Sequence, residues 1–191
     1  MHEGRRIPPL QWQPPLARTR RRYRRSIVVW AGLGLTLLAT AVLLNQGIRP
    51  APRVVWNASA SAPIGFWRIQ PGKPIHTGDA VLAHTPDSVR GLAARRRYIP
   101  ANVPLLKRVV ARSGDRVCAR GNAIYINGHR AAVRHAVDPH GRPLPWWQGC
   151  GRLRIGQFFL LMPAPDSFDS RYFGPVDQAA IIGRAIPLWT R

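Results

Sequence analysis

The chain has 191 residues, a length that fits one domain of ordinary size with an appendage. Hydrophobic residues make up 46% of the sequence, so a wholly disordered basic protein is excluded. The 29 lysines and arginines outnumber the 8 acidic residues and give a formal net charge of +21. Such a charge is typical of nucleic-acid binding, but the positions of the charges along the chain decide whether that interpretation holds.

Residues 1–26 are predicted to form a flexible basic arm. The first 25 residues contain eight arginines, four prolines and one acidic residue, a net charge of +7. Residues 27–44 then carry no charge, and as a helix they would span roughly 27 Å, close to the thickness of a bilayer's hydrocarbon core. The sequence therefore predicts a transmembrane anchor over residues 27–45. A cleaved signal peptide is the alternative, but the apolar run is long for that role, and Ala39-Thr40-Ala41 lies inside it.

The arginines that flank the apolar run predict its orientation. Six of them lie within residues 18–25, directly before the run, whereas only Arg49 and Arg53 follow it closely. Positive flanks stay in the cytoplasm, so we expect the arm to be cytoplasmic and residues 46–191 to be exported. The exported part holds 21 basic and 7 acidic residues, which can face anionic membrane lipid or an acidic substrate. Because the arm has no helix-turn-helix or zinc pattern, we expect no nucleic-acid partner.

Both cysteines, Cys118 and Cys150, lie in the part predicted to be exported. In an oxidising compartment such a pair is typical of a disulfide, and without a CxxC partner it makes a poor zinc site. We therefore expect a Cys118–Cys150 disulfide.

Residues 46–191 are predicted to be mainly β, because short runs of β-branched and aromatic residues alternate with Gly, Pro, Asn and Asp. The predicted strands cover residues 64–69, 80–83, 105–111, 116–119, 123–126, 130–133, 158–162 and 179–188. Asn127-Gly128 predicts a type I′ hairpin turn between two of them. Only residues 88–97 are predicted to be helical, and the proline-containing stretch 138–151 is predicted to be a long surface excursion.

The residue types available for chemistry are few. Lys73 and Lys107 are the only lysines, and arginine stays protonated in proteins, so a neutral amine can come only from these two side chains. The sequence contains neither the HExxH pattern of metalloproteases nor a GxSxG elbow. Three histidines lie near Asp138 without a recognised ligand spacing: His129, His135 and His140. We expect neither a metal nor another cofactor.

Two segments are suited to nucleophilic catalysis. After the predicted anchor, the small residues from Ala58 to Ala62 leave the hydroxyls of Ser59 and Ser61 accessible, although most such turns are linkers. Lys107 interrupts an apolar strand, and alternation places it on one face with Leu105 and Val109. Burial on that face lowers a lysine pKa from about 10.4 towards 8, which gives a general base. The alternative is an edge-strand lysine whose amine reaches water.

Three ordered segments carry a resemblance: Ser59-x-Ser61-x-Pro63-x-Gly65-Phe66-Trp67, then Leu106-Lys107-Arg108-Val109-Val110 with Ser113-Gly114-Asp115, then Ser167-Phe168-Asp169-Ser170-Arg171-Tyr172. They resemble the boxes of the bacterial type I signal peptidase family, and the Ser-Ala-Pro at the first box is similar to its TraF-type conjugative-transfer branch. The resemblance implies a signal-peptidase-like β-fold catalytic domain in the periplasm, behind one inner-membrane anchor.

The resemblance also implies site residues. Ser61 would be the nucleophile and Lys107 the general base of a Ser/Lys dyad, with Ser59 as the fallback nucleophile. The Ser61 backbone N–H and the Ser59 hydroxyl would form the oxyanion hole. Ser167 would orient the lysine amine, and an Asp169–Arg171 ion pair would brace the site.

The implied substrate is an exported precursor protein, a conjugative pilin or another transfer component. Two alternatives remain open: a general signal peptidase for secreted preproteins, and a non-enzymatic basic membrane protein of a secretion or conjugation channel. A serine nucleophile forms an acyl-enzyme with its substrate. The sequence predicts neither the oligomeric state nor whether water or an amine releases the acyl group from this intermediate.

Overall fold

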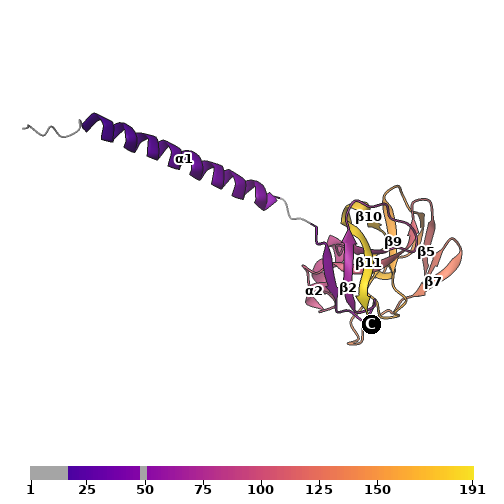
Figure 1. The fold of residues 1–191 in the computed structure, drawn as a ribbon. Helices are drawn as coiled ribbons and strands as arrows, with labels where there is room; N and C mark the ends of the chain where they lie inside the picture. Colours follow the sequence, from indigo (N-terminus) through magenta and orange to yellow (C-terminus); the bar gives the residue numbers. More distant parts are fainter. Residues whose placement is uncertain (1–16, 48–50) are drawn as a thin grey trace, which may run out of the picture. The chain divides into compact units, whose positions relative to one another are not determined.

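A computed structural model of the chain describes residues 17–47 and 51–191 (Figure 1). The chain divides into two units, Met1–Pro50 and Ala51–Arg191. The described part of the first unit is one helix, and the second unit contains all of the described strands. Residues 1–16 of the predicted arm lie outside the described residues.

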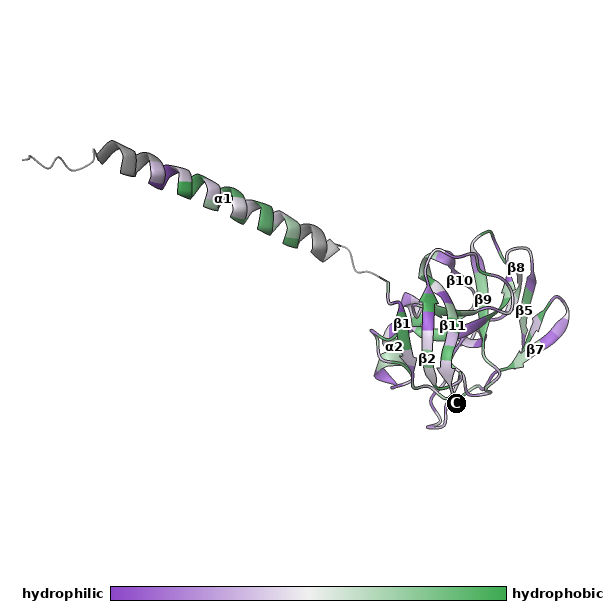
Figure 2. Ribbon diagram, in the orientation of Figure 1, coloured by the Kyte–Doolittle hydropathy of each residue, from purple (hydrophilic) through white to green (hydrophobic). Residues whose placement is uncertain are grey.

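Helix α1 (Ala17–Gly47) contains the predicted anchor. Its segment Tyr23–Val42 is long and apolar enough to cross a membrane, and none of it is buried within the chain (Figure 2). The helix begins ahead of residue 27, so the prediction of a flexible arm is wrong for residues 17–26. Arginine is a strong helix former, and each residue added to an existing helix gains a backbone hydrogen bond, so the helix continues through the charged segment.

The second unit is built on two sheets of antiparallel pairs, which confirms the predicted mainly β fold class. The larger sheet has the order β1-β2-β11-β3-β4-β9-β10, and the smaller has the order β7-β6-β5-β8. The larger contains β1 (Val54–Asn57), β2 (Gly65–Gln70), β3 (Ala80–Ala83), β4 (Leu105–Arg112), β9 (Gln157–Leu161), β10 (Val176–Asp177) and β11 (Ile181–Thr190). The smaller contains β5 (Arg116–Arg120), β6 (Ala123–Ile126), β7 (His129–Val133) and β8 (Gly149–Arg152).

Three helical segments complete this unit: α2 (Asp87–Arg95), α3 (Ser170–Phe173) and the 3-10 segment η1 (Gln178–Ala180). The prediction of a helix near residues 88–97 is confirmed by α2. The sequence did not predict β1, β8, β10 or α3. All four are short, and β8, with the sequence Gly-Cys-Gly-Arg, has no β-branched or aromatic residue to indicate a strand.

Strand β4 lies inside the larger sheet, hydrogen-bonded to β3 on one side and to β9 on the other. It carries Lys107, which stands opposite Val81 of β3. The alternative of an edge-strand lysine is therefore wrong.

Strands β1 and β2 are joined by the loop that holds Ser59 and Ser61, and β2 pairs on its other side with β11. A side chain at Gly65 would meet the carbonyl oxygen of Trp189 at 2.0 Å, so only glycine lets β11 pass this close to the start of β2. This close approach fixes the end of the serine loop against the sheet.

The smaller sheet contains two predicted features. Asn127 and Gly128 have φ angles of 50° and 89°, which confirms the turn between β6 and β7. Cys118 of β5 stands directly opposite Cys150 of β8, and the predicted disulfide joins them. The excursion predicted for residues 138–151 is wrong at its end, because residues 149–151 belong to β8.

The core spans both sheets. One buried cluster combines residues of β4 and β9 with residues of β5 and β6, among them Phe159 and Ile124, both fully buried. Trp147 packs against the same cluster, with its ring centroid 6.1 Å from that of Phe159. The packed apolar surface therefore holds the strand with Lys107 at the centre of the unit.

Candidate active site

The serine loop between β1 and β2 is held mainly by the buried side chain of Asn57, and Trp67 Nε1 adds a hydrogen bond to the Pro63 carbonyl at 3.2 Å. The Asn57 amide nitrogen donates hydrogen bonds to the carbonyl oxygens of Ser59, Ala62 and Pro63, at 3.0, 3.1 and 3.0 Å. Its amide oxygen accepts a hydrogen bond from the backbone N–H of Ser59 at 3.1 Å. Asparagine side chains can hydrogen-bond nearby backbone groups in place of the hydrogen bonds of a helix or sheet. Here these bonds hold the shape of the turn.

Lys107 lies under this loop. Its side chain is 3% exposed, and Leu105 and Val109 are buried with it, as alternation along the strand predicts. Its amine Nζ is 3.2 Å from Ser61 Oγ and 2.8 Å from Ser167 Oγ. Burial lowers the pKa of the Lys107 amine to about 8, the negative charge of Asp169 opposes that shift, and Arg171 adds to it. The amine is thus held against a serine hydroxyl in a setting that favours its neutral form.

Ser59 lies on the other side of Ser61. The two hydroxyl oxygens are 2.9 Å apart, and the Ser61 backbone N–H donates to Ser59 Oγ at 3.3 Å. Of the two hydroxyls, only that of Ser61 is hydrogen-bonded to Lys107 within the part of the chain that the structure describes.

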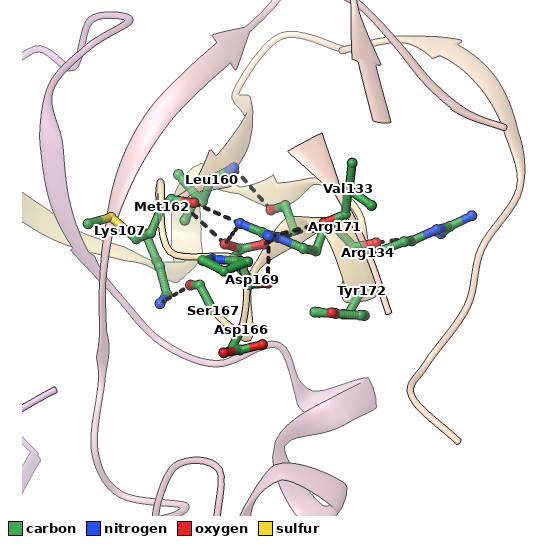
Figure 3. A network of polar contacts seen from close by, with 12 residues as sticks. Lys107, Val133, Arg134, Leu160, Met162, Asp166, Ser167, Asp169, Arg171 and Tyr172 are labelled. Atoms are coloured by element: carbon green, nitrogen blue, oxygen red, sulfur yellow. Dashed lines mark hydrogen bonds and ion pairs between the residues drawn. The ribbon is translucent and has the colours of Figure 1, made fainter. Parts of the chain in front are cut away.

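The third predicted segment contributes a buried ion pair (Figure 3). The guanidinium of Arg171 donates to both carboxylate oxygens of Asp169, at 2.8 and 3.0 Å, and neither side chain is more than 3% exposed. Asp169 also caps α3 and accepts the backbone N–H of Met162, while Arg171 donates to three backbone carbonyls. With its donors and acceptors paired, the ion pair can stay charged in the interior.

Two cavities meet at these residues, one of about 450 Å³ and one of about 610 Å³. Ser59, Ser61 and Lys107 line both of them. The first is also lined by Phe168 and Tyr172, and the second is lined mostly by apolar side chains of β1, β4 and the segment before β4. Space on two sides of a serine suits a polypeptide that extends past it in both directions.

Asp138 fixes a wall of the first cavity. It accepts hydrogen bonds from the Tyr98 hydroxyl, from Arg142 Nε and from the backbone N–H groups of His140 and Arg142. Burial raises the pKa of the Asp138 carboxyl, but these bonds together outweigh it and the pKa is lowered. Across residues 17–47 and 51–191, no group of three or more histidine, cysteine or acidic residues is placed to hold a metal ion.

The chain matches the family model described as "Signal peptidase, peptidase S26" over residues 25–189. It belongs to this family. It is 31% identical over 177 residues to the conjugal transfer protein TraF of Agrobacterium fabrum, covering 87% of this chain and 97% of that one. It is 32% identical over 181 residues to a probable conjugal transfer protein TraF of Sinorhizobium fredii, covering 90% and 94%.

A crystal structure of a signal peptidase I from Enterococcus faecalis aligns with a TM-score of 0.34 and 23% identity, over 60% of this chain and 98% of that one.

The structure of this S26 family member brings six of the predicted site residues together: Ser59, Ser61, Lys107, Ser167, Asp169 and Arg171. The disulfide lies in the smaller sheet and lines neither cavity. Sequence reasoning missed Asn57 and Asp138. An asparagine at the start of a turn was a usable signal for the first. The role of Asp138 depends on its hydrogen bond with Tyr98, which lies 40 positions earlier in the chain, so no local pattern indicates it.

Proposed function

We propose that the chain is a membrane-anchored serine endopeptidase with a Ser61/Lys107 dyad that processes exported precursor proteins of conjugation, a pilin precursor among them. The observation that carries the proposal is the 3.2 Å contact between Lys107 Nζ and Ser61 Oγ, made by an amine whose pKa burial lowers to about 8. A neutral amine at this distance can accept the proton of the hydroxyl.

In the proposed reaction, Ser61 Oγ attacks the scissile carbonyl carbon while Lys107 takes the hydroxyl proton. The tetrahedral intermediate collapses, the C–N bond breaks, and Lys107 returns the proton to the leaving amine. A water molecule then gives a proton to Lys107 and attacks the acyl ester. The C–Oγ bond breaks, Lys107 returns the proton to Ser61 Oγ, and the new carboxyl end leaves. The hydrogen bond from Lys107 Nζ to Ser167 Oγ, at 2.8 Å, keeps the amine directed during these transfers.

The oxyanion would be stabilised by the Ser61 backbone N–H and the Ser59 hydroxyl. In the free chain these two groups are hydrogen-bonded to each other at 3.3 Å. A substrate carbonyl oxygen that takes the place of Ser59 Oγ as the acceptor would receive both donors.

The conjugative substrate rests on the relatives, whose names place them in conjugal or plasmid transfer. The proposed location is the bacterial inner membrane, with α1 as a single-pass anchor, the N-terminus in the cytoplasm and residues 51–191 in the periplasm. The apolar segment Tyr23–Val42 supports an anchor, and the arginines before it support this orientation.

The test uses the full chain in detergent with a candidate pilin precursor. We expect Ser61→Ala and Lys107→Met to lower kcat/KM by about 10⁴-fold, and Ser59→Ala to lower it by about 10²-fold, as expected for loss of one oxyanion donor. The matched control is Ser88→Ala on the exposed side of α2, which leaves kcat/KM unchanged. Activity that survives in Ser61→Ala but is lost in Ser59→Ala would move the nucleophile to Ser59. Undiminished activity in both Ser61→Ala and Lys107→Met rejects the proposal.

A further inference from the structure

The first cavity beside Ser61 differs in charge from the rest of its unit. Of the lysines and arginines among residues 51–191, only Lys107 lines either cavity. Two aspartates, Asp138 and Asp166, line the first cavity. A basic unit thus presents carboxylates, and no guanidinium, to a ligand next to its candidate nucleophile.

The two aspartates differ in what they can do. Asp138 is 6% exposed and already accepts four hydrogen bonds from Tyr98, Arg142 and His140, so it is engaged in holding the cavity wall. The Asp166 side chain is 82% exposed, and its one ion pair within the described residues is with His135 Nε2 at 3.5 Å. A histidine supplies positive charge only when it is protonated. Asp166 is therefore the carboxylate available to a ligand.

Asp166 also has a fixed place relative to the dyad. It directly precedes Ser167, whose hydroxyl accepts the hydrogen bond of Lys107 at 2.8 Å (Figure 3). A group bound to Asp166 from within the cavity would belong to residues of the substrate near the scissile bond.

The cavity surface next to Asp166 is aromatic. Tyr98, Phe168 and Tyr172 line it, and the Phe168 ring centroid is 5.2 Å from that of Tyr98 and 5.8 Å from that of Tyr172. Aromatic faces contact the apolar stem and the cationic tip of a long basic side chain, and a carboxylate at the rim pairs with its charge. This combination fits lysine or arginine.

We infer that Asp166 is a specificity-determining residue, which selects substrates with a lysine or arginine side chain close to the scissile bond. The inference rests on the proposed peptidase function and deepens it. The basic side chain would lie along the aromatic wall of the first cavity and take the place of His135 beside the Asp166 carboxylate.

The test uses the full chain in detergent and quenched fluorescent peptides derived from the cleaved precursor. Each peptide carries lysine, its uncharged isostere norleucine, or glutamate at one position flanking the scissile bond. At one of these positions we expect kcat/KM for lysine to exceed that for norleucine by about fivefold, the effect of one partly exposed charge pair. The ratio should fall to about one in Asp166→Asn and favour glutamate in Asp166→Lys.

Two further variants separate recognition from a structural effect. His135→Arg places a permanent cation against Asp166 and should also lower the lysine preference. Asp87→Asn removes an exposed aspartate that lines neither cavity and should keep the preference. Cleavage without any lysine preference in the wild type, or a preference that survives in Asp166→Asn, overturns the inference and leaves the peptidase intact. Equal absence of cleavage in the wild type and in Ser61→Ala contradicts both proposals.

Discussion

At the scale of single residues, the pKa of Lys107 comes from a balance of its surroundings. Burial acts against its charged form and is the largest influence, and Asp169 and Arg171 act in opposite directions. Because Arg171 holds both oxygens of Asp169, the carboxylate's effect on the lysine is partly cancelled. An unpaired carboxylate at that position would keep the amine protonated and unable to act as a base.

This balance predicts the pH dependence of the proposed peptidase. Lys107 must lose its proton before it can accept that of Ser61, so kcat/KM should be low well below the pKa of about 8, rise through it, and level off above it. The measurement is kcat/KM for one uncharged peptide from about pH 6 to about pH 10. Tryptophan fluorescence over the same range serves as the control that the chain stays folded. A flat profile, or one that falls through this range, contradicts the assignment of Lys107 as the base.

At the scale of elements, local patterns predicted most of the strands and failed where a segment depends on distant partners. Alternation predicted β4 and placed Lys107 on one face with Leu105 and Val109, and the Asn127-Gly128 pair predicted the hairpin turn, because both signals lie within a few residues. The four-residue strand β8 is defined by its pairing with β5, and the Asp138 wall by its contact with Tyr98. Such contacts form only after the chain has folded.

The site residues Ser61, Lys107, Ser167, Asp169 and Arg171 were predicted from the three ordered segments that resemble the family's boxes. Asn57 lies in none of these segments.

The loop between β1 and β2 should depend on Asn57. Asn57→Ala removes four hydrogen bonds, at a cost of about 2 kcal/mol in folding stability. It leaves the Ala62 carbonyl without its partner, whereas the Ser59 and Pro63 carbonyls still accept hydrogen bonds from the Ala62 N–H and from Trp67 Nε1. Because the substitution displaces the serine loop and leaves most of both cavities intact, we expect kcat to fall by about tenfold or more and KM to change much less. Steady-state kinetics and thermal unfolding measure the two effects.

The matched control is Asn122→Ala, an exposed asparagine in the turn between β5 and β6. It should change neither kcat nor the unfolding temperature. An Asn57→Ala variant with wild-type kcat would show that the loop keeps its shape without the buried amide.

At the scale of the whole molecule, the net charge of +21 has separate roles along the sequence. In the proposed topology, the arginines before the apolar run orient the anchor, and those after it add positive charge to the second unit. The cavities beside Ser61 are the exception, because their lining contains no arginine. The total net charge is typical of nucleic-acid binding, whereas the positions of the charges along the chain support the proposed membrane orientation.

The proposed topology predicts the outcome of a reporter fusion. Alkaline phosphatase, which is active only after export, should be active when it is joined to the C-terminus. Replacing the six arginines of residues 18–25 with glutamine removes the positive flank before the anchor and leaves Arg49 and Arg53 after it. Because basic residues near a membrane helix stay in the cytoplasm, a fraction of the chains should then insert in the opposite orientation and reporter activity should fall by roughly half or more.

The reciprocal variant, with Arg49 and Arg53 replaced by glutamine, should keep full activity. Unchanged activity after loss of the six arginines would assign the orientation to the translocated domain instead of the flanking charge.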